Sequence, residues 1–227
     1  MDVEKKNIKN IHLSVYPPEG AVRVSAPLRL DTGLIRIFTI QKLDWIKRQQ
    51  RKLREQERET KREFKSKESH YLWGKRYLLK LVEADGSHHI TLDHKHLTLH
   101  LPINATEEKK SFILEKHHRE ELRAAAQVMI DLWSEKIGVH LDKFFIQKMK
   151  TMWGSCSPYN QSIRINLELI KKPPQCLEYI IVHELIHLIE PTHNERFVTL
   201  LNHHMPQWRH HRDELNLLPV SHEDWKY

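Results

Sequence analysis

The strongest constraint on this sequence is a pair of histidines one helical turn apart within an apolar run, QCLEYIIVHELIHLIE. The apolar residues of the run recur at helical spacing: Leu177, Ile180, Ile181, Leu185 and Leu188. Because an α-helix rises about 1.5 Å per residue, His183 and His187 project from the same face. Two imidazoles so placed can bind one metal ion, and Glu184 beside them can act as a general base on water. The run therefore predicts a buried helix that carries a metal-dependent hydrolytic site.

A third ligand is expected shortly after this helix. Pro191 ends the helix and His193 follows, so a turn would bring His193 back to the pair and leave the fourth position of a zinc ion for water. Glu190 is a rival third ligand, although a carboxylate so close along the helix is less able to complete a tetrahedron. The alternative is a pair of core histidines and a surface histidine that bind no metal, since 18 histidines make a chance match less rare. We expect one ion, zinc or another divalent metal.

Composition limits the class of protein. Only two cysteines, Cys156 and Cys176, are present, which excludes a disulfide framework and a metal site made of cysteines alone. With 39% hydrophobic and 30% charged residues, the chain is expected to be globular. No apolar run reaches the roughly 18 residues of a membrane-spanning helix, and the charged start MDVEKKNIKN has no secretion signal. We therefore expect a cytoplasmic protein with no membrane partner.

Positive charge is concentrated in one segment. The formal net charge is +7, and residues 47–67 hold ten Lys or Arg against four Glu. This segment has no Gly or Pro and consists mostly of good helix formers, so we expect a solvated basic helix that continues an apolar helical pattern from about Thr32. Such a helix can bind polyanions, with nucleic acid the weaker inference. The alternative is an exposed helix whose charges only keep the chain soluble.

The rest of the N-terminal half has the alternation of β-strands. IHLSV and AVRVSA flank Pro17-Pro18-Glu19-Gly20, which predicts a hairpin. RYLLKLVE, HHITLDH and HLTLHLP predict a small antiparallel sheet. We therefore expect a β-rich region with a helical arm over residues 1–103.

The C-terminal half, residues 104–227, is expected to be mainly helical. Residues 106–137 predict a helix that ends at Gly138 and packs through a set of apolar positions: Phe112, Leu122, Ala125, Met129, Leu132 and Trp133. A strand, KFFIQKM, and the segment TMWGSCSPYNQSIRINLEL precede a helix opened by Pro173-Pro174. The predicted fold class is α+β.

The segment WGSCS has two interpretations. A turn at Gly154 can present backbone N–H groups to an oxyanion or phosphate, with a further hydrogen bond from Ser155. Equally, it can be a structural turn packed on the metal-binding helix. Cys156 as a nucleophile is a rival mechanism, but an isolated cysteine is more often a small buried apolar residue.

These motifs together resemble the YgjP-like metal-dependent hydrolases, whose zinc motif is similar to that of SprT-type and other zincin metallopeptidases. The shared positions are Trp153-Gly154-Ser155-Cys156-Ser157, Ile163-Arg164-Ile165-Asn166 with Leu169, Pro174, the H-E-L-x-H string, His193, Phe197 and Met205-Pro206-Gln207-Trp208. The N-terminal hairpin, KLDWIKRQQRKL and YLWGKRYLLKL also match, so the resemblance covers almost the whole chain. The chain departs from the family at Met152, where Arg is common, and around the third histidine.

The resemblance implies a zincin-like, mainly α core with an added β-rich N-terminal part. It also implies zinc at His183, His187 and His193, with Glu184 as general base. Such proteins are described both as metallopeptidases and as UTP pyrophosphatases, which cleave a nucleoside triphosphate to a monophosphate and diphosphate.

Charge separates these two substrates. A triphosphate carries about four negative charges, which cations near Trp153 would offset. A single three-histidine zinc site is more familiar in amide hydrolysis. We expect a nucleotide substrate, with a peptide as the alternative and a nucleic-acid-binding module with structural zinc as the third. The expected substrate-binding residues are Lys148, Lys150, Trp153, Gly154, Ser155 and Arg164.

Overall fold

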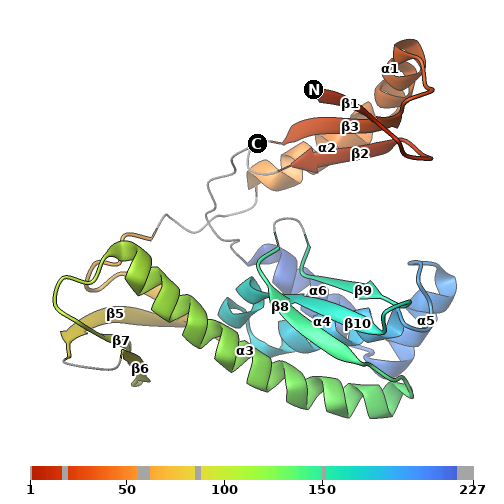
Figure 1. Ribbon diagram of the computed structural model, residues 1–227. Coiled ribbons are helices and arrows are strands. Elements are labelled where there is room, and N and C mark those ends of the chain that lie inside the picture. The colour runs from red at the N-terminus through yellow and green to blue at the C-terminus, as the bar shows by residue number, and fades with distance from the viewer. Residues whose placement is uncertain (1, 17–19, 56–61, 85–87, 150–151, 219–227) are drawn as a thin grey trace. The chain divides into compact units, whose positions relative to one another are not determined.

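The computed structural model forms two compact units, divided between Thr60 and Lys61 (Figure 1). It describes residues 2–16, 20–55, 62–84, 88–149 and 152–218. Six α-helices and three small sheets in these ranges confirm the α+β class. None of the described helices combines the length and apolarity needed to cross a membrane. The functional division between residues 103 and 104 stays a prediction.

The first unit contains a three-stranded sheet in the order β1-β3-β2. Its strands are β1 (Asp2–Lys6), β2 (His12–Tyr16) and β3 (Ala21–Pro27). β2 and β3 pair antiparallel, which confirms the predicted hairpin, although residues 17–19 of its turn lie outside the described residues. β1 pairs parallel with β3 and was not predicted, because its five residues are all exposed and so lack the alternation that marks a half-buried strand.

Two helices follow in this unit, α1 (Thr32–Gln41) and α2 (Leu43–Glu55). Asp31 caps α1 by accepting a hydrogen bond from the backbone N–H of Gly33 at 2.7 Å. The expectation of one continuous helix from Thr32 is wrong, because α1 ends at a C-cap, Lys42.

The predicted basic helix over residues 47–67 is also wrong in its last part. Residues 62–67 are not helical, and residues 56–61 lie outside the described part of the chain. Phe64 and Lys67 have positive φ angles, 52° and 70°. Phe64 is buried in a hydrophobic cluster, and the N–H of Lys67 bonds to the carbonyl of Leu79 at 2.8 Å. Burial of one aromatic ring and pairing with a strand therefore override the helix propensity of this segment.

The second unit begins with a four-stranded sheet in the order β4-β5-β7-β6. Its strands are β4 (Ser69–Leu72), β5 (Lys75–Glu83), β6 (His89–Leu92) and β7 (His96–Leu101). β5 and β7 pair parallel, so the expected antiparallel sheet is wrong and the sheet is mixed. β7 buries most of its residues and takes an inner position, whereas the more exposed β6 lies at the edge.

A single long helix, α3 (Glu107–Ile137), joins this sheet to the rest of the unit (Figure 1). The predicted ends are confirmed, since Thr106 caps its start and Gly138 adopts the left-handed conformation after its end.

The predicted core face of α3 is wrong at Phe112 and Leu132, which are 64% and 44% exposed. The buried residues are Ile113, Leu114, His118, Leu122, Ala126, Ile130 and Trp133. The face shifts because α3 packs on β6 and β7 near its start and on α4 further along.

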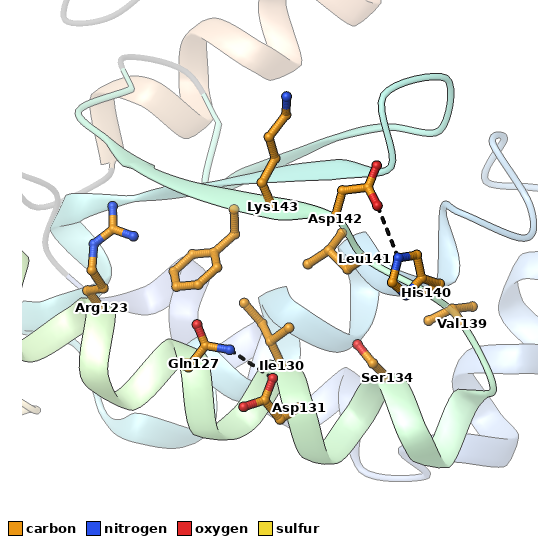
Figure 2. A pocket seen from close by; sticks show the side chains of 11 residues that line it. Arg123, Gln127, Ile130, Asp131, Ser134, Val139, His140, Leu141, Asp142 and Lys143 are labelled. Atoms are coloured by element: carbon orange, nitrogen blue, oxygen red, sulfur yellow. Dashed lines mark hydrogen bonds and ion pairs between the residues drawn. The ribbon is translucent and has the colours of Figure 1, made fainter.

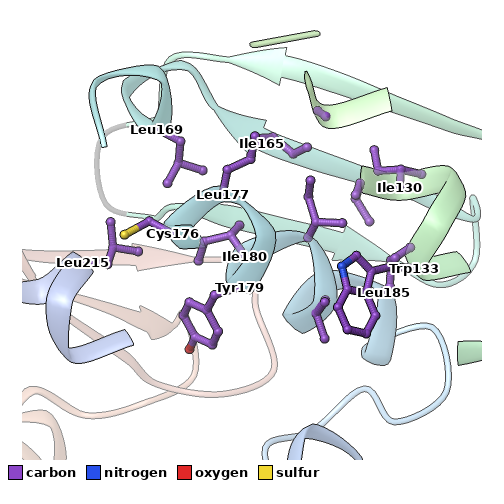
Figure 3. Close-up of a cluster of buried hydrophobic side chains, with 14 of the residues drawn as sticks. Ile130, Trp133, Ile165, Leu169, Cys176, Leu177, Tyr179, Ile180, Leu185 and Leu215 are labelled. Atoms are coloured by element: carbon purple, nitrogen blue, oxygen red, sulfur yellow. The ribbon is translucent and has the colours of Figure 1, made fainter. Parts of the chain in front are cut away.

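The C-terminal part of this unit has a second sheet, β8-β10-β9, covered by helices. Its elements are β8 (Lys143–Gln147), β9 (Gly154–Ser157), β10 (Ser162–Asn166), the short helix η1 (Leu167–Lys171), α4 (Pro174–Ile186), α5 (Glu195–His204) and α6 (Trp208–Leu217). Figure 3 shows the main hydrophobic cluster, to which α3, β10, α4 and α6 contribute side chains. α4 lies inside this cluster with nine buried residues, as its sequence predicted.

We predict that Leu122 and Phe112, a buried and an exposed residue of α3, differ sharply in their contribution to the free energy of unfolding. Leu122→Ala removes a fully buried side chain and should lower the free energy of unfolding by about 2–5 kcal/mol. Phe112→Ala removes an exposed ring and should change it by less than about 0.5 kcal/mol. Urea unfolding followed by circular dichroism measures both values. Equal losses would show that the buried face of α3 is assigned incorrectly.

Candidate metal centre

The candidate metal centre lies at the C-terminal end of α4. Pro174 opens this helix, where the missing N–H costs nothing, and His187 is its C-cap. The chain then turns, and the side chain of Asn194 accepts a hydrogen bond from the N–H of Phe197 at 3.0 Å to start α5. This cap fixes the point at which the chain reverses and so places His193 beside the end of α4.

Three imidazole nitrogens converge in this turn. His193 Nε2 lies 3.0 Å from His187 Nε2 and 3.0 Å from His183 Nε2. A zinc ion with bonds of 2.0–2.1 Å in tetrahedral geometry separates its nitrogen ligands by about 3.3 Å. The spacing is therefore close to that of three ligands of one ion. His193 is exposed, so the centre is open to solvent on that side.

The chemistry of the donor set fits a divalent metal. His187 Nδ1 donates a hydrogen bond to the carbonyl oxygen of Glu190 at 3.0 Å, which leaves the lone pair of its Nε2 free. Burial, and then the imidazoles of His187 and His193, lower the pKa of His183 to about 3. Burial also lowers the pKa of His187. Both rings are therefore neutral near pH 7 and can act as ligands.

The ring of Phe197 on α5 contacts the imidazole rings of all three histidines. Its ring centroid lies 5.0 Å from that of His183, 4.5 Å from that of His187 and 4.8 Å from that of His193. The contacts with His183 and His193 are edge-to-face, and the contact with His187 is stacked. Phe197 is only 2% exposed, so one rigid side chain restricts the orientation of all three candidate ligands.

Glu184 projects from α4 into a narrow space beneath β9. Its side chain is 5% exposed, and burial raises its pKa to about 8. A Cβ atom on Gly154 would lie 2.5 Å from Glu184 Oε1, so only glycine lets the strand approach the carboxyl group. The sequence singled out Gly154 for its turn, and the structure gives it this closer contact.

The structure gives other surroundings to the two rival candidates, Glu190 as the third metal ligand and Cys156 as the nucleophile. The Glu190 carboxylate accepts a hydrogen bond from the Thr192 hydroxyl at 3.0 Å, and its carbonyl orients His187. Burial, and then the nearby Glu184, raise the pKa of Cys156 to about 12. A thiol that stays protonated is a poor nucleophile.

Three of the predicted substrate-binding residues, Lys148, Arg164 and Ser155, have other surroundings in the structure, and the role of all six in substrate binding stays a prediction. Lys148 forms an ion pair with Glu115 of α3 at 2.8 Å. Arg164 is exposed and lies over Phe145, while its neighbours on β10 face the core, so it points from the opposite face of the sheet. Ser155 is its cross-strand partner.

Lys150 and Trp153 precede β9 in the sequence. Trp153 is half-buried, with the ammonium of Lys172 5.8 Å from its ring centroid. Lys150 lies outside the described residues. Of the predicted substrate-binding residues that the structure describes, Gly154 is therefore the one placed against Glu184.

An aromatic stack beside the centre was only partly anticipated. Trp208, one of the positions shared with the family, is buried and stacks on Tyr179 with centroids 6.3 Å apart. Tyr179 in turn meets His183 edge-to-face at 5.8 Å. Helical spacing places Tyr179 one turn before His183, but only the packing of α6 on α4 shows that Trp208 supports it.

A separate pocket of about 550 Å³ lies between α3 and β8 (Figure 2). Several of its polar groups pair with each other: the amide of Gln127 donates to Asp131 at 2.8 Å, and His140 bonds to Asp142 at 3.0 Å. None of the predicted site residues lines this pocket. The convergent histidines remain the centre of the candidate site.

Comparison with known proteins supports a metal-dependent domain. A family model described as YgjP-like, metallopeptidase domain, matches residues 9–217. No curated protein sequence matches the chain. The solved metallopeptidase zymogen abylysin of Pyrococcus abyssi is similar with 18% identity and a TM-score of 0.39, covering 43% of this chain and 99% of that chain. Jannalysin of Methanocaldococcus jannaschii, also a metallopeptidase zymogen, is similar with 20% identity and a TM-score of 0.36, covering 40% of this chain and 86% of that chain. With TM-scores this low, nothing about the function of this chain follows from the two structures.

We predict that removal of the third histidine abolishes tight metal binding. His193→Ala should weaken zinc affinity by more than about 100-fold, since loss of a group that only supports a ligand already costs about 10–100-fold. His140→Ala removes an exposed histidine away from the centre and should have no effect. Competition with a chromogenic zinc chelator measures both affinities. An unchanged affinity in His193→Ala would exclude this ligand set.

Phe197→Leu tests whether the ring beneath the ligands matters to the metal. The substitution keeps an apolar side chain but removes the flat surface that touches the three imidazoles, so zinc affinity should fall about 10-fold. The visible absorption of the cobalt-loaded protein should change with it. Phe144→Leu, a partly buried position of the same cluster, is the control. If both variants bind zinc equally well, Phe197 contributes only to packing.

Proposed function

The chain belongs to the YgjP-like family of metallopeptidase domains, and we propose that its centre hydrolyses peptide bonds with Glu184 as general base. One observation carries the proposal: a buried carboxyl group packs against the edge strand β9 and directly follows, in the chain, one of three converging imidazoles. His183, His187 and His193 are the proposed metal ligands, and zinc is the proposed metal. A bound divalent ion supplies Lewis acidity, which lowers the pKa of water and polarises the bond to be cleaved.

Glu184 is suited to move the proton in this reaction. Its raised pKa places proton uptake near neutral pH, and a nearby divalent cation favours the ionised form that can accept a proton. The carboxylate takes a proton from water as the oxygen attacks the carbonyl carbon. The same proton then passes to the leaving nitrogen as the C–N bond breaks. The packing of Gly154 keeps the carboxyl group in one place during both steps.

The position of β9 favours a peptide as substrate. β9 pairs antiparallel with β10 and lies at the edge of its sheet, so its other side has no strand partner among the described strands. An extended peptide can add to such an edge through backbone hydrogen bonds. Since β9 contains the glycine that touches Glu184, a peptide bound there would pass close to the proposed base.

A nucleoside triphosphate, the substrate favoured by charge and family resemblance, is the second candidate. Two guanidinium groups support it: those of Arg209 and Arg212 lie 4.5 and 5.0 Å from the ring centroid of Trp208. Trp208 stacks on Tyr179, which meets His183 edge-to-face, so these guanidinium groups are two aromatic rings away from His183, and that of Arg212 also pairs with Asp213 at 2.8 Å. They differ from the cations expected around Trp153. A purely structural zinc is the third candidate, although it would leave the buried Glu184 without a role.

We predict that Glu184→Gln abolishes hydrolysis while zinc remains bound. The amide cannot accept the proton, so turnover of the true substrate should fall at least about 100-fold. Unfolded casein and UTP are the two substrates to test, with release of new amino groups and of diphosphate as the measurements. Glu195→Gln, an exposed carboxylate on α5, is the control.

The outcomes separate the candidates. Cleavage of casein that depends on Glu184 supports the peptidase, and release of diphosphate from UTP that depends on Glu184 supports the second candidate. Full activity of Glu184→Gln on both substrates would contradict the general-base assignment. Zinc binding without turnover of either would favour a structural metal.

A further inference from the structure

The structure divides the basic segment of the sequence into two parts with different surroundings. In the second part, Arg62 lies 3.7 Å from a carboxylate oxygen of Glu68, and Lys65 pairs with Glu63. The first part forms α2, which contains five Lys or Arg and two acidic residues. The exposed basic side chains without a carboxylate partner among the described residues are therefore concentrated in the first part.

Four basic residues of α2 are exposed and lack acidic partners. Lys47, Arg48, Arg51 and Arg54 are exposed, and none has a carboxylate oxygen within 4.0 Å among the residues that the structure describes. Three of them line one hollow of about 340 Å³ together with Gln50. Positive charge without internal compensation attracts anions.

The hollow follows one side of the helix. Lys47, Arg51 and Arg54 are four and three residues apart, so they lie on one stripe about 10 Å long. We name these three residues the α2 basic stripe. Successive phosphates of a nucleic acid strand carry one charge every ~3.4 Å along the duplex axis, so several can meet the stripe together.

α2 is fixed to the sheet of its own unit through a face that adjoins the stripe. Ile46 is buried, and the amide of Gln50 donates a hydrogen bond to the carbonyl oxygen of Gly20 at 2.8 Å. Gly20 has a φ of 83°, and a Cβ atom there would lie 2.7 Å from Gln50 Cγ, so this contact requires glycine. The stripe is thus presented on a helix that is held in place by residues next to the stripe.

The chemistry of the stripe favours nucleic acid over an anionic membrane. Two of its three residues are arginines, whose planar guanidinium groups bind phosphate oxygens in pairs. A helix that lies on a membrane needs an apolar face along its basic residues. Leu43 and Trp45 at the start of α2 are exposed, but the only apolar residue from Lys47 to Arg54 is Leu53, which is half-buried. A surface of this kind recognises the phosphate backbone without reading the bases.

We propose that the α2 basic stripe binds the phosphodiester backbone of nucleic acid. The inference goes beyond hydrolysis and does not depend on which substrate the metal centre cleaves. It assigns to the N-terminal unit a binding function that is separate from hydrolysis at the metal centre.

The test compares two triple variants of the full chain. Lys47→Gln, Arg51→Gln and Arg54→Gln together remove the stripe, and should weaken binding to a short fluorescein-labelled DNA duplex by at least about 10-fold. The slope of log affinity against log salt between about 50 and 200 mM should fall by about 3, one for each lost phosphate contact. Lys75→Gln, Arg76→Gln and Lys80→Gln remove the same charge from exposed positions of β5 and should have little effect.

A charge-conserving variant and two competing ligands test the proposal further. Arg51→Lys with Arg54→Lys keeps the charge and should keep the salt slope, which separates charge from misfolding. Equal losses in the two triple variants, or no binding of DNA by the wild-type chain, would overturn the proposal. Preferential binding to phosphatidylserine vesicles, or displacement of DNA by equimolar UTP, would also overturn it in favour of a membrane or a nucleotide.

Discussion

Burial of α4 is the constraint on which the second unit depends. This helix packs against α3, β9, β10, α5 and α6, so its side chains form much of the hydrophobic cluster. Polar groups in a buried helix are costly, because an unpaired buried polar group costs about 1–3 kcal/mol, and His183 Nδ1 is such a group among the described residues. His183, Glu184 and His187 lie at its C-terminal end, where the chain opens towards the exposed His193. The surrounding elements thus set the environment of the candidate ligands.

The same burial gives the polar groups their chemical properties. Removal from water keeps His183 neutral and raises the pKa of Glu184, so the ligands can bind a cation and the carboxyl group can exchange a proton near neutral pH. Phe197 and Gly154 then restrict geometry from two sides. The first contacts the three imidazoles with a flat ring, and the second leaves space for the Glu184 carboxyl group beneath β9. Neither residue is a proposed ligand or base, but both restrict the positions of the side chains that are.

The two units use charge differently. In the second unit, Lys148 and Arg62 are paired with carboxylates, which removes them as free cations for a substrate. In the first unit, the α2 basic stripe has no such partners within the described residues. A count of charges along the sequence treats all these residues alike, because pairing depends on neighbours that are distant in the chain. Net charge therefore indicated an anionic partner, and the pairing pattern suggests which part of the chain would meet it.

Several features were determined by the sequence alone. Local signals were strong enough to predict α4 and its histidines, the start of α3 at Thr106 and its end at Gly138, and the hairpin of β2 and β3, because caps, turns and periodicity act over a few residues. The family was also evident from spaced motifs, and the family match over residues 9–217 confirms it.

Tertiary structure decided the rest. The parallel pairing of β5 with β7, the buried face of α3 and the non-helical path around Phe64 depend on contacts between distant parts of the chain. Each is set by which distant apolar surface is available. Tertiary structure also turned Arg164 away from the metal centre and brought Phe197 beneath it. Sequence spacing fixes which side chains share a face of one element, whereas packing between elements decides what that face meets.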